Sequence, residues 1–281
     1  MKIGAVIQAR TSSTRFPKKV LRSLPYGEDI CVLQQDIRRV KKSKLLDEVI
    51  IATTTNSEDD EIVEVAIKEN TSYFRGSLDN VLERYYEAAL EYNLDVIVRI
   101  TSDCPCIDWN VIDKVIKSHL DSGADYTSNS LIESFPRGID CEVINFEALE
   151  KSFFNATKDY EKEHVTPYIY KSHPEYFKIN KYSQNNDNSD IRITLDTPQD
   201  YSLLCLIYDE LYENNNFFQL EDILELFDRK PWIRNINEEV IQKKVCNNLN
   251  EELIEAIHLC DTQDLKRAKK YLELNLEKNN E

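Results

Sequence analysis

The chain has 281 residues, 41% of them hydrophobic, and its 35 Lys and Arg against 51 Asp and Glu give a formal net charge of −16. We expect no nucleic acid and no membrane among its partners, because both require a basic protein surface. The charge is uneven, since residues 1–44 hold 11 Lys and Arg against 3 Asp and Glu. This local excess of positive charge indicates an anionic ligand of limited size.

The seven cysteines are odd in number and form no CxxC pair. No signal peptide is evident, because the apolar run after Met1 is only about five residues long. No stretch approaches the ~18 apolar residues of a membrane span. We therefore expect a cytoplasmic protein whose cysteines are reduced and serve as small hydrophobic residues. Cys104 and Cys106 flank Pro105, but no second Cys or His cluster supports a metal site there.

The first 130 residues alternate between short apolar runs and segments with helical periodicity. The first run, residues 3–7, is apolar throughout, which is typical of a strand in a parallel sheet covered by helices on both faces. Strands are predicted at 3–7, 49–53, 73–74, 95–100 and from 124, with helices around 30–40, 57–66, 81–92 and 112–120. Ligands bind such sheets at the carboxyl ends of the strands, so the loops after the first four strands are the candidate site.

The second half of the chain is less regular. Strands are predicted at 141–146 and 191–195, helices at 147–157 and 160–171, a polar loop at 184–189, and helices from Pro198 onward. We expect a main α/β domain over residues 1–231 and a C-terminal helical extension over residues 232–281.

A basic and hydroxyl-rich loop follows the first predicted strand. The sequence QARTSSTRFPKK, residues 8–19, contains four cations and four hydroxyl groups. Arg binds phosphate oxygens with a fork of donors and Lys acts as a point charge, while hydroxyl and backbone N–H groups add further donors. The loop is not a Walker A motif, because GxxxxGK[ST] is absent. A solvated basic loop is the alternative, but its position after the first strand and the stiffness of Pro17 favour phosphate binding.

The stretch IQARTSSTRFPKKVL resembles the nucleotide-binding signature of the cytidylyltransferases that make CMP-activated sugars. These are the CMP-Kdo synthetases and acylneuraminate cytidylyltransferases, and the SpsF-type spore-coat polysaccharide proteins are the most similar branch. The resemblance covers roughly residues 1–245, through ATTTNSEDDEI, FRGSLDNVLERYYEAA, DVIVRITSDCPCID, FPRGIDCEV, EKEHVTPYIY and IRITLDTPQD. It implies a Rossmann-like (GT-A-like) α/β nucleotidyltransferase domain, a mostly parallel sheet sandwiched by helices. The family's usual loop has Gly where Lys18 stands here, and Lys19 aligns with its triphosphate lysine.

By this resemblance, Arg10, Arg15 and Lys19 hold the triphosphate of CTP, and Arg10, Lys19 and Asp103 are catalytic. The resemblance also implies that Asp79 and Arg84 approach the base and ribose. A helix-capping Asp and an exposed helical Arg are the alternative interpretation of these two residues. The expected nucleotide-binding residues are Ala9, Arg10, Ser12, Ser13, Arg15, Lys19, Thr53, Asp79, Arg84 and Asp103.

Asp103 and Asp196 are the candidate metal ligands. Mg²⁺, the expected cofactor, binds one or two carboxylates together with phosphate oxygens and water. Asp103 ends a predicted central strand, where a turn or N-cap role is the alternative. The alternative is stronger for Asp196, because Asp-Thr-Pro is a typical start of a helix.

The resemblance places the acceptor near residues 135–185, which are also expected to form the dimer contact of a homodimer. Arg137 is a candidate ligand for an acceptor carboxylate or phosphate, and Gly138 marks a turn. His164 is a candidate acceptor ligand or proton acceptor, with a structural His as the alternative. The expected acceptor-binding residues are Arg137, Gly138, Asp140, Glu142, His164 and Arg192.

These motifs predict a CTP-dependent cytidylyltransferase that transfers CMP to a small acidic acceptor and releases pyrophosphate. The acceptor is expected to be a sugar acid, a phosphonate or a phosphorylated metabolite, and the pathway that of a surface polysaccharide or other glycan. One alternative is a GT-A glycosyltransferase that uses a nucleotide sugar, but the chain contains no Asp-x-Asp motif. Transfer from another NTP is the second alternative, because few contacts decide the identity of the base.

Overall fold

The computed structural model describes residues 1–240 and 248–279 and divides the chain into two compact units, residues 1–240 and 241–281. The boundary between the units follows Val240. From the sequence we had expected it after residue 231. The reason is that Pro231–Ile236 forms a short 3₁₀ helix, η5, whose Ile233 is buried in the core of the first unit. No helix among the described residues is long and apolar enough to cross a membrane.

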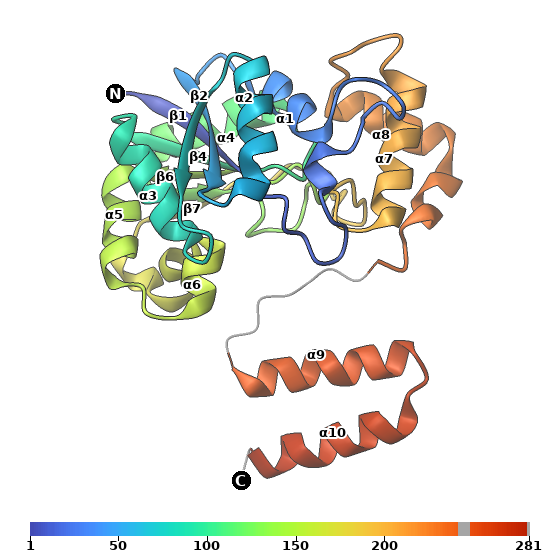
Figure 1. Ribbon diagram of the computed structural model, residues 1–281. Coiled ribbons are helices and arrows are strands. Elements are labelled where there is room, and N and C mark those ends of the chain that lie inside the picture. The colour runs from blue at the N-terminus through green and yellow to red at the C-terminus, as the bar shows by residue number, and fades with distance from the viewer. Residues whose placement is uncertain (241–247, 280–281) are drawn as a thin grey trace. The chain divides into compact units, whose positions relative to one another are not determined.

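Seven strands of the first unit form one sheet in the order β3-β2-β1-β4-β6-β5-β7 (Figure 1). The pairs β1–β2, β1–β4, β2–β3 and β5–β7 are parallel, whereas β6 is antiparallel to both β4 and β5. The expected mostly parallel sheet is therefore confirmed. The strands are β1 (Ile3–Gln8), β2 (Glu48–Thr54), β3 (Ser72–Gly76), β4 (Val96–Thr101), β5 (Tyr126–Ser128), β6 (Glu142–Asn145) and β7 (Ile179–Lys181).

Helices cover both faces of this sheet, as the all-apolar strands predict. On β1, Ile7 packs in the cluster that includes α1, α2, α4, α7 and α8, and the next side chain towards the N-terminus, Val6, packs in the cluster of α3 and α5. The helices of the first unit are α1 (Val32–Val40), α2 (Asp60–Lys68), α3 (Val81–Glu91), α4 (Trp109–Ser122), α5 (Phe146–Asn155), α6 (Asp159–His164), α7 (Pro198–Leu211) and α8 (Leu220–Arg229). The second unit contains α9 (Leu249–Thr262) and α10 (Lys266–Asn279).

Local sequence signals set the ends of the helices near the sheet edge. The Asp108 carboxylate caps α4 by accepting from the backbone N–H groups of Asn110 and Val111. Gly123 ends that helix in the left-handed conformation, with φ of 58°. Thr197 caps α7, and Pro198 occupies its first position. The chain therefore enters α7 at a fixed point directly after Asp196.

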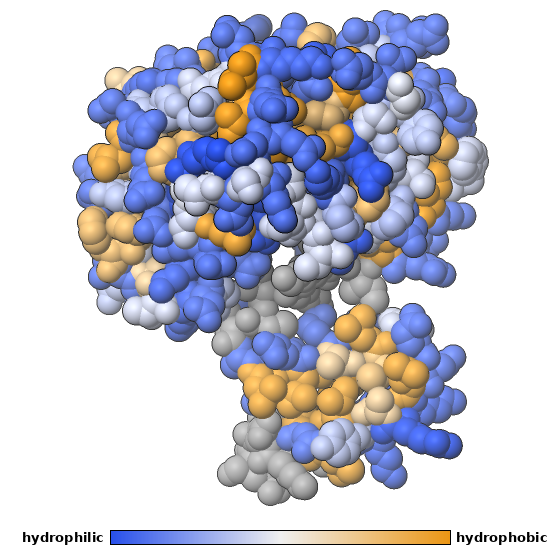
Figure 2. Space-filling model, in the orientation of Figure 1, coloured by the Kyte–Doolittle hydropathy of each residue, from blue (hydrophilic) through white to orange (hydrophobic). Residues whose placement is uncertain are grey.

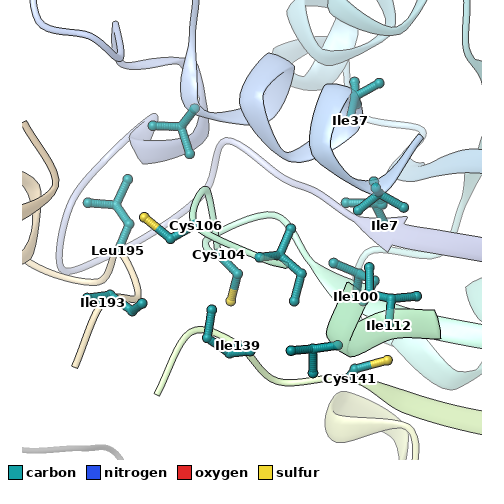
Figure 3. Close-up of a cluster of buried hydrophobic side chains, with 14 of the residues drawn as sticks. Ile7, Ile37, Ile100, Cys104, Cys106, Ile112, Ile139, Cys141, Ile193 and Leu195 are labelled. Carbon is teal, nitrogen blue, oxygen red and sulfur yellow. The ribbon is translucent and has the colours of Figure 1, made fainter. Parts of the chain in front are cut away.

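The cysteines of the first unit lie in its hydrophobic core. Figure 3 shows Cys104, Cys106 and Cys141 among isoleucine and leucine side chains, and all three are buried. The six described cysteines are free thiols. They serve as small hydrophobic residues, as expected.

Two predicted elements of the second half differ in the structure. Residues 191–195 do not form a sheet strand, because their backbone pairs only through a bridge between Arg192 and Arg137. The helix predicted at 160–171 is interrupted, since α6 ends at His164 and Tyr168–Ser172 forms a separate π-helical turn. The apolar pattern indicated burial correctly in both segments, but burial alone does not specify the backbone conformation.

Candidate active site

The loop after β1 is tied to the start of α2. The backbone N–H of Thr11 and its hydroxyl group donate to Asp59 Oδ1 at 2.7 and 2.8 Å. The loop also closes on itself, because the carbonyl of Thr11 accepts from Ser13 and Lys18 at 2.9 and 3.1 Å. Asp59 is buried and Thr54 of β2 donates to its other oxygen. The basic loop is thus held in a defined shape at the carboxyl edge of the sheet.

Lys18 occupies the position where the resembling loops have glycine, and its φ of 53° is left-handed. A non-glycine residue is uncommon in this conformation, which gives a physical reason for the usual glycine. The Lys18 ammonium pairs with Glu61 of α2. The loop borders a cavity of about 530 Å³, which Ser12 and Ser13 line together with Glu58 and Glu61.

Lys19 brings the two candidate metal ligands together. Its Nζ lies 2.8 Å from Asp103 Oδ2, 2.8 Å from Asp196 Oδ1 and 2.7 Å from the carbonyl oxygen of Leu195. Burial opposes the charge on Asp103, but Lys19 overcomes this and lowers the pKa of the carboxyl group to about 2. Burial likewise opposes the charge on Lys19, and the two carboxylates more than compensate and raise its pKa. Both aspartates lie far apart in sequence, and only the fold makes them neighbours.

Asp196 is also held by two arginines. Its Oδ2 lies 3.1 Å from Nη2 of Arg15 and 3.0 Å from Nη2 of Arg192. Arg192 is in turn fixed by Asp200, whose Oδ1 and Oδ2 accept at 2.9 and 3.0 Å. Arg192 was expected to bind the acceptor, and the structure puts it in the cluster with Asp196. Three cations therefore surround one candidate metal ligand.

The predicted base-side residues differ in burial. Arg84 is 1% exposed, and its Nε and Nη1 atoms have no hydrogen-bond partner in the described part of the chain. Burial lowers the pKa of the Arg84 guanidinium, and the positive charge of Arg10 acts in the same direction. Thr53 is also buried, and its hydroxyl group has no hydrogen-bond partner among the residues that the structure describes. Asp79 is exposed and does not cap α3, because Asn80 does so.

Two further loop residues complete the predicted nucleotide set. The N–H of Ala9 donates to the carbonyl oxygen of Ala52 at 3.1 Å, so this donor is used within the sheet. Arg10 is exposed and makes no hydrogen bond or ion pair with another described residue. Arg10 is therefore a cation at the sheet edge whose charge is not neutralised by a carboxylate.

Arg137 and Gly138 lie against the segment that leads to Asp196. The N–H of Arg137 donates to Ile191, and its carbonyl accepts from Ile193, both at 2.8 Å. Gly138 has φ of 110°, and a Cβ atom there would lie 2.7 Å from the backbone of Ile193. The Arg137 guanidinium pairs with Asp140 at 3.3 Å. Leu195 in turn donates to the carbonyl oxygen of Asp103 at 2.8 Å, so these segments form one connected backbone unit.

Glu142, the first residue of β6, lies in a buried cluster of polar side chains. It pairs with Arg99 of β4 and accepts from the hydroxyl groups of Tyr126 and Thr166, the latter at 2.8 Å. Burial opposes its charge, but Arg99 and these donors lower the pKa of the Glu142 carboxyl group. Arg99 also donates to Gln8 Oε1 at 3.2 Å. Glu142 is therefore fully engaged within the protein.

His164 precedes a strained turn beside this cluster. Val165 has φ of 71° and ψ of −55°, and Thr166 donates to the carbonyl oxygen of His164 at 2.9 Å. This is a γ-turn, a conformation that is rare for a β-branched residue. The turn directs Thr166 to Glu142 and leaves His164 half-buried. Strain of this kind concentrates at functional sites, which agrees with the predicted importance of this segment.

Sequence reasoning missed three polar residues that build the site: Asp59, Arg99 and Asp200. Asp59 directly precedes α2 and Asp200 lies in the first turn of α7, where the Thr197–Asp200 capping box was a usable signal. Arg99 interrupts the apolar β4 strand, which is an unusual place for a cation.

Comparison with known proteins identifies the family. The sequence model of the cytidylyltransferase family matches residues 5–226. The chain belongs to the cytidylyltransferase family. It is 34% identical over 233 residues to the spore coat polysaccharide biosynthesis protein SpsF of Bacillus subtilis, covering 80% of this chain and 94% of that protein. The predicted family and its SpsF-like branch are thereby confirmed, and the protein is a nucleotidyltransferase enzyme.

Other relatives agree with this family membership. An uncharacterised protein of Methanocaldococcus jannaschii is 41% identical over 248 residues, which cover 86% of this chain and 97% of that protein. A solved cytidylyltransferase structure from Leptospira borgpetersenii is 35% identical, with a TM-score of 0.77 over 88% of this chain and 100% of the other. A CMP-2-keto-3-deoxy-manno-octonic acid synthetase solved with CTP is only 14% identical, with a TM-score of 0.56, and shows the shared fold.

The carboxylates of this family member form a donor set that suits Mg²⁺. Asp103 and Asp196 converge on one cation, the Lys19 ammonium, and Mg²⁺ prefers one or two carboxylates completed by phosphate oxygens and water. Across residues 1–240 and 248–279, no group of three or more His, Cys, Asp or Glu side chains is arranged to hold a metal ion. The two aspartates therefore fit Mg²⁺ as residues that would share it with a nucleotide.

Proposed function

We propose that this protein transfers CMP from CTP to a small acidic acceptor and releases pyrophosphate. The observation that carries the proposal is the Lys19 ammonium held between Asp103 and Asp196 at 2.8 Å each, beside the basic loop of Arg10 and Arg15. Lys19 and Arg15 form ion pairs with Asp103 and Asp196 at the carboxyl edge of the parallel strands, which is where such folds bind nucleotides. This arrangement supports the binding of a triphosphate together with a divalent cation.

In the proposed reaction, an acceptor oxygen attacks the α-phosphorus of CTP in line with the departing group. The bond between that phosphorus and its oxygen bridge to the β-phosphate breaks, and this oxygen leaves with pyrophosphate. Positioning and charge neutralisation supply most of the catalysis of such a transfer. Mg²⁺, held by Asp103 and Asp196, would neutralise negative charge on the transferring and leaving phosphates.

The cations of the first loop have distinct tasks in this proposal. Arg10 binds triphosphate oxygens directly, because no carboxylate competes for it in the described part of the chain. Arg15 and Lys19 exchange part of their contacts with Asp196 for phosphate oxygens when the nucleotide binds. Lys19 enters this exchange fully protonated, since its raised pKa keeps it charged at neutral pH.

The acceptor is proposed to bind near Arg137 and His164. Arg137 is 46% exposed in its side chain and engages only one carboxylate, Asp140, by a long contact of 3.3 Å. An acidic acceptor group would form a shorter, bidentate pair with the same guanidinium. SpsF is a spore coat polysaccharide biosynthesis protein by name, and we propose a related glycan role for this chain.

A pyrophosphate-release assay tests the proposal. Each of the four NTPs is incubated with Mg²⁺ and a panel of sugar acids, phosphonates and phosphorylated small molecules. The expected result is pyrophosphate release that requires CTP, Mg²⁺ and one class of acceptor. If pyrophosphate is released only with an NTP other than CTP, the protein is a nucleotidyltransferase that uses that nucleotide instead. Absence of release with every pair, together with hydrolysis of UDP-sugars, would contradict the proposal in favour of a glycosyltransferase.

Arg84 provides a residue-level test of the nucleotide pocket. Its buried Nε and Nη1 have no hydrogen-bond partner among residues 1–240 and 248–279, and loss of a donor that pairs with a ligand costs roughly 10-fold or more in affinity. We expect Arg84→Lys to raise the KM for CTP by about that factor while kcat changes less. Arg229→Lys, at the end of α8, is the matched control and should leave both constants unchanged. An unaltered KM in Arg84→Lys would remove this residue from the pocket.

A further inference from the structure

The second unit is a helical hairpin that lies outside the part of the chain matched by the family, residues 5–226. It consists of α9 and α10, which contact each other. Asn248 caps α9 through a hydrogen bond of 3.0 Å from the N–H of Glu251. The hairpin is therefore a part of the chain that the family model does not describe.

The two helices do not cover their own apolar side chains. Among residues 248–276, only Cys260 is buried. Ile254 and Leu259 of α9 are 53% and 45% exposed, and Tyr271 and Leu274 of α10 are 69% and 50% exposed. Figure 2 shows hydrophobic side chains gathered over the surface of the hairpin.

The apolar arc is too wide for one neighbouring helix. At about 100° per residue, the apolar side chains of α9 follow one another around the helix in the order Leu259, Leu253, Ile257 and Ile254 and span roughly 220°. An amphipathic surface helix typically buries an apolar stripe of about 100° or somewhat more. A further apolar surface is needed to bury the remainder.

The charges of the two helices are opposite. Residues 249–262 contain four Asp and Glu and no Lys or Arg, whereas residues 266–279 contain five Lys and Arg and two Glu. Within the hairpin, Lys269 of α10 pairs with Asp261 of α9 at 2.5 Å. The same complementarity is available to a second hairpin if α9 of one copy faces α10 of the other.

We propose that the hairpin binds a second copy of itself and forms a four-helix bundle that links two chains. A two-fold axis then makes both new helix contacts equivalent, and each places an acidic helix against a basic one. Packing of α9 against the same helix of the other copy would instead bring like charges together. The acidic α9 likewise disfavours an anionic membrane as the occupant of this face.

The size of the face limits the surface that the association can bury. Each helix has 14 residues and is about 21 Å long, and two helices side by side are about 20 Å wide. Two such faces bury on the order of 1,000 Å² in total, at the lower end for specific protein interfaces. We therefore expect an association that depends on concentration in the micromolar range.

Sedimentation of the full chain from 1 to 100 µM tests the proposal. The wild-type mass should rise with concentration, and Ile254→Lys with Leu274→Glu should lower the association constant at least tenfold. Both side chains are half exposed, so the hairpin retains its own contacts, and the net charge of the chain is unchanged. Ile67→Lys with Leu90→Glu, at similarly exposed positions of the first unit, is the matched control and should associate like the wild type.

Hydrogen exchange of the wild-type chain provides a second measurement that needs no variant. Protection of the α9 and α10 amides should increase from 1 to 100 µM. Protection that does not depend on concentration, or equal association of the double variant and the wild type, would overturn the proposal. Binding to phosphatidylserine vesicles without self-association would assign the face to a lipid surface and overturn it as well. Nucleotidyl transfer should be unchanged in the double variant, so these outcomes are separate from those of the enzyme assay.

Discussion

Asp103 shows how one side chain can be constrained by several neighbours at once. Its carboxylate pairs with Lys19, and its carbonyl oxygen accepts from Leu195 and Thr194. Its pKa of about 2 keeps it ionised throughout the neutral range. Asp103 can therefore hold a cation without first having to lose a proton.

Asp103→Asn should reduce kcat about 100-fold or more, because it removes a carboxylate that is proposed to hold Mg²⁺ at the phosphates and that orients Lys19. The amide is similar in size, so the circular dichroism spectrum should remain that of the wild type. Asp121→Asn, on the exposed side of α4, is the control and should be fully active. Activity of Asp103→Asn close to that of the wild type would refute its metal-binding role.

Asp36 of α1 is a second buried carboxyl group near this cluster, and neither of its oxygens has a hydrogen-bond partner among the described residues. Burial raises its pKa well above the usual value, and Asp103 adds to the shift against the opposing charges of Arg39 and Lys19. The folded state thus retains a proton that the unfolded chain releases above about pH 4. The contribution of Asp36 to stability is complete below that pH and is lost as the pH rises towards the folded pKa.

Asp36→Asn should therefore gain stability relative to the wild type as the pH rises. The difference in the free energy of unfolding should grow between pH 5 and 8 by up to about 1.4 kcal/mol per pH unit, measured by urea denaturation. Asp29→Asn, whose side chain is exposed, should show no such trend. A difference that is constant with pH would show that Asp36 is ionised in the folded protein.

At the scale of elements, the site depends on the backbone contact between residues 137–138 and 191–195. This contact fixes the segment that delivers Leu195 and Asp196 to Lys19. Residues 191–195 were predicted to form a strand of the sheet, because their apolar residues alternate as they do in a strand. The apolar side chains of Ile193 and Leu195 instead pack beside Cys104 and Ile139, as Figure 3 shows.

Gly138→Ala tests this contact. A Cβ atom at this position would lie 2.7 Å from the Ile193 carbonyl group, and φ of 110° adds backbone strain. We expect a loss of about 2–4 kcal/mol in the free energy of unfolding and a fall in turnover. Gly27→Ala is the matched control, because its φ is also positive, at 85°, but apart from its chain neighbours no atom of the described residues lies within 4 Å of the added Cβ. A loss equal to that of Gly27→Ala would show that the backbone contact at Gly138 is unimportant.

At the scale of the whole molecule, a net charge of −16 coexists with the proposed site for an anionic nucleotide. An acidic chain can still attract an anion locally, because exposed charges interact over only about 10 Å at 0.1 M salt. Within that distance a triphosphate at the proposed site would experience Arg10, Arg15 and Lys19, whereas much of the acidic surface would be screened.

Raising NaCl from 50 to 300 mM should therefore increase the KM for CTP several-fold, because salt weakens the local attraction. The overall charge alone would give the opposite trend, since salt would then screen a repulsion. Arg15→Gln should show a smaller dependence on salt than the wild type. A KM that falls with salt would mean that the whole-molecule field dominates the site.

The sequence by itself determined the α/β class, most of the elements of residues 1–130 and the family, because these follow from periodicity and from motifs in linear order. It also identified Lys19, Asp103 and Asp196 one at a time. Only the tertiary structure decided that these three meet, that Arg192 joins Asp196, and that Glu142 is engaged by Arg99. The physical reason is that a charge acquires its partner, its burial and its pKa from residues up to 181 positions away in the chain, as in the pair of Arg15 and Asp196. Local sequence patterns carry no information on such distances.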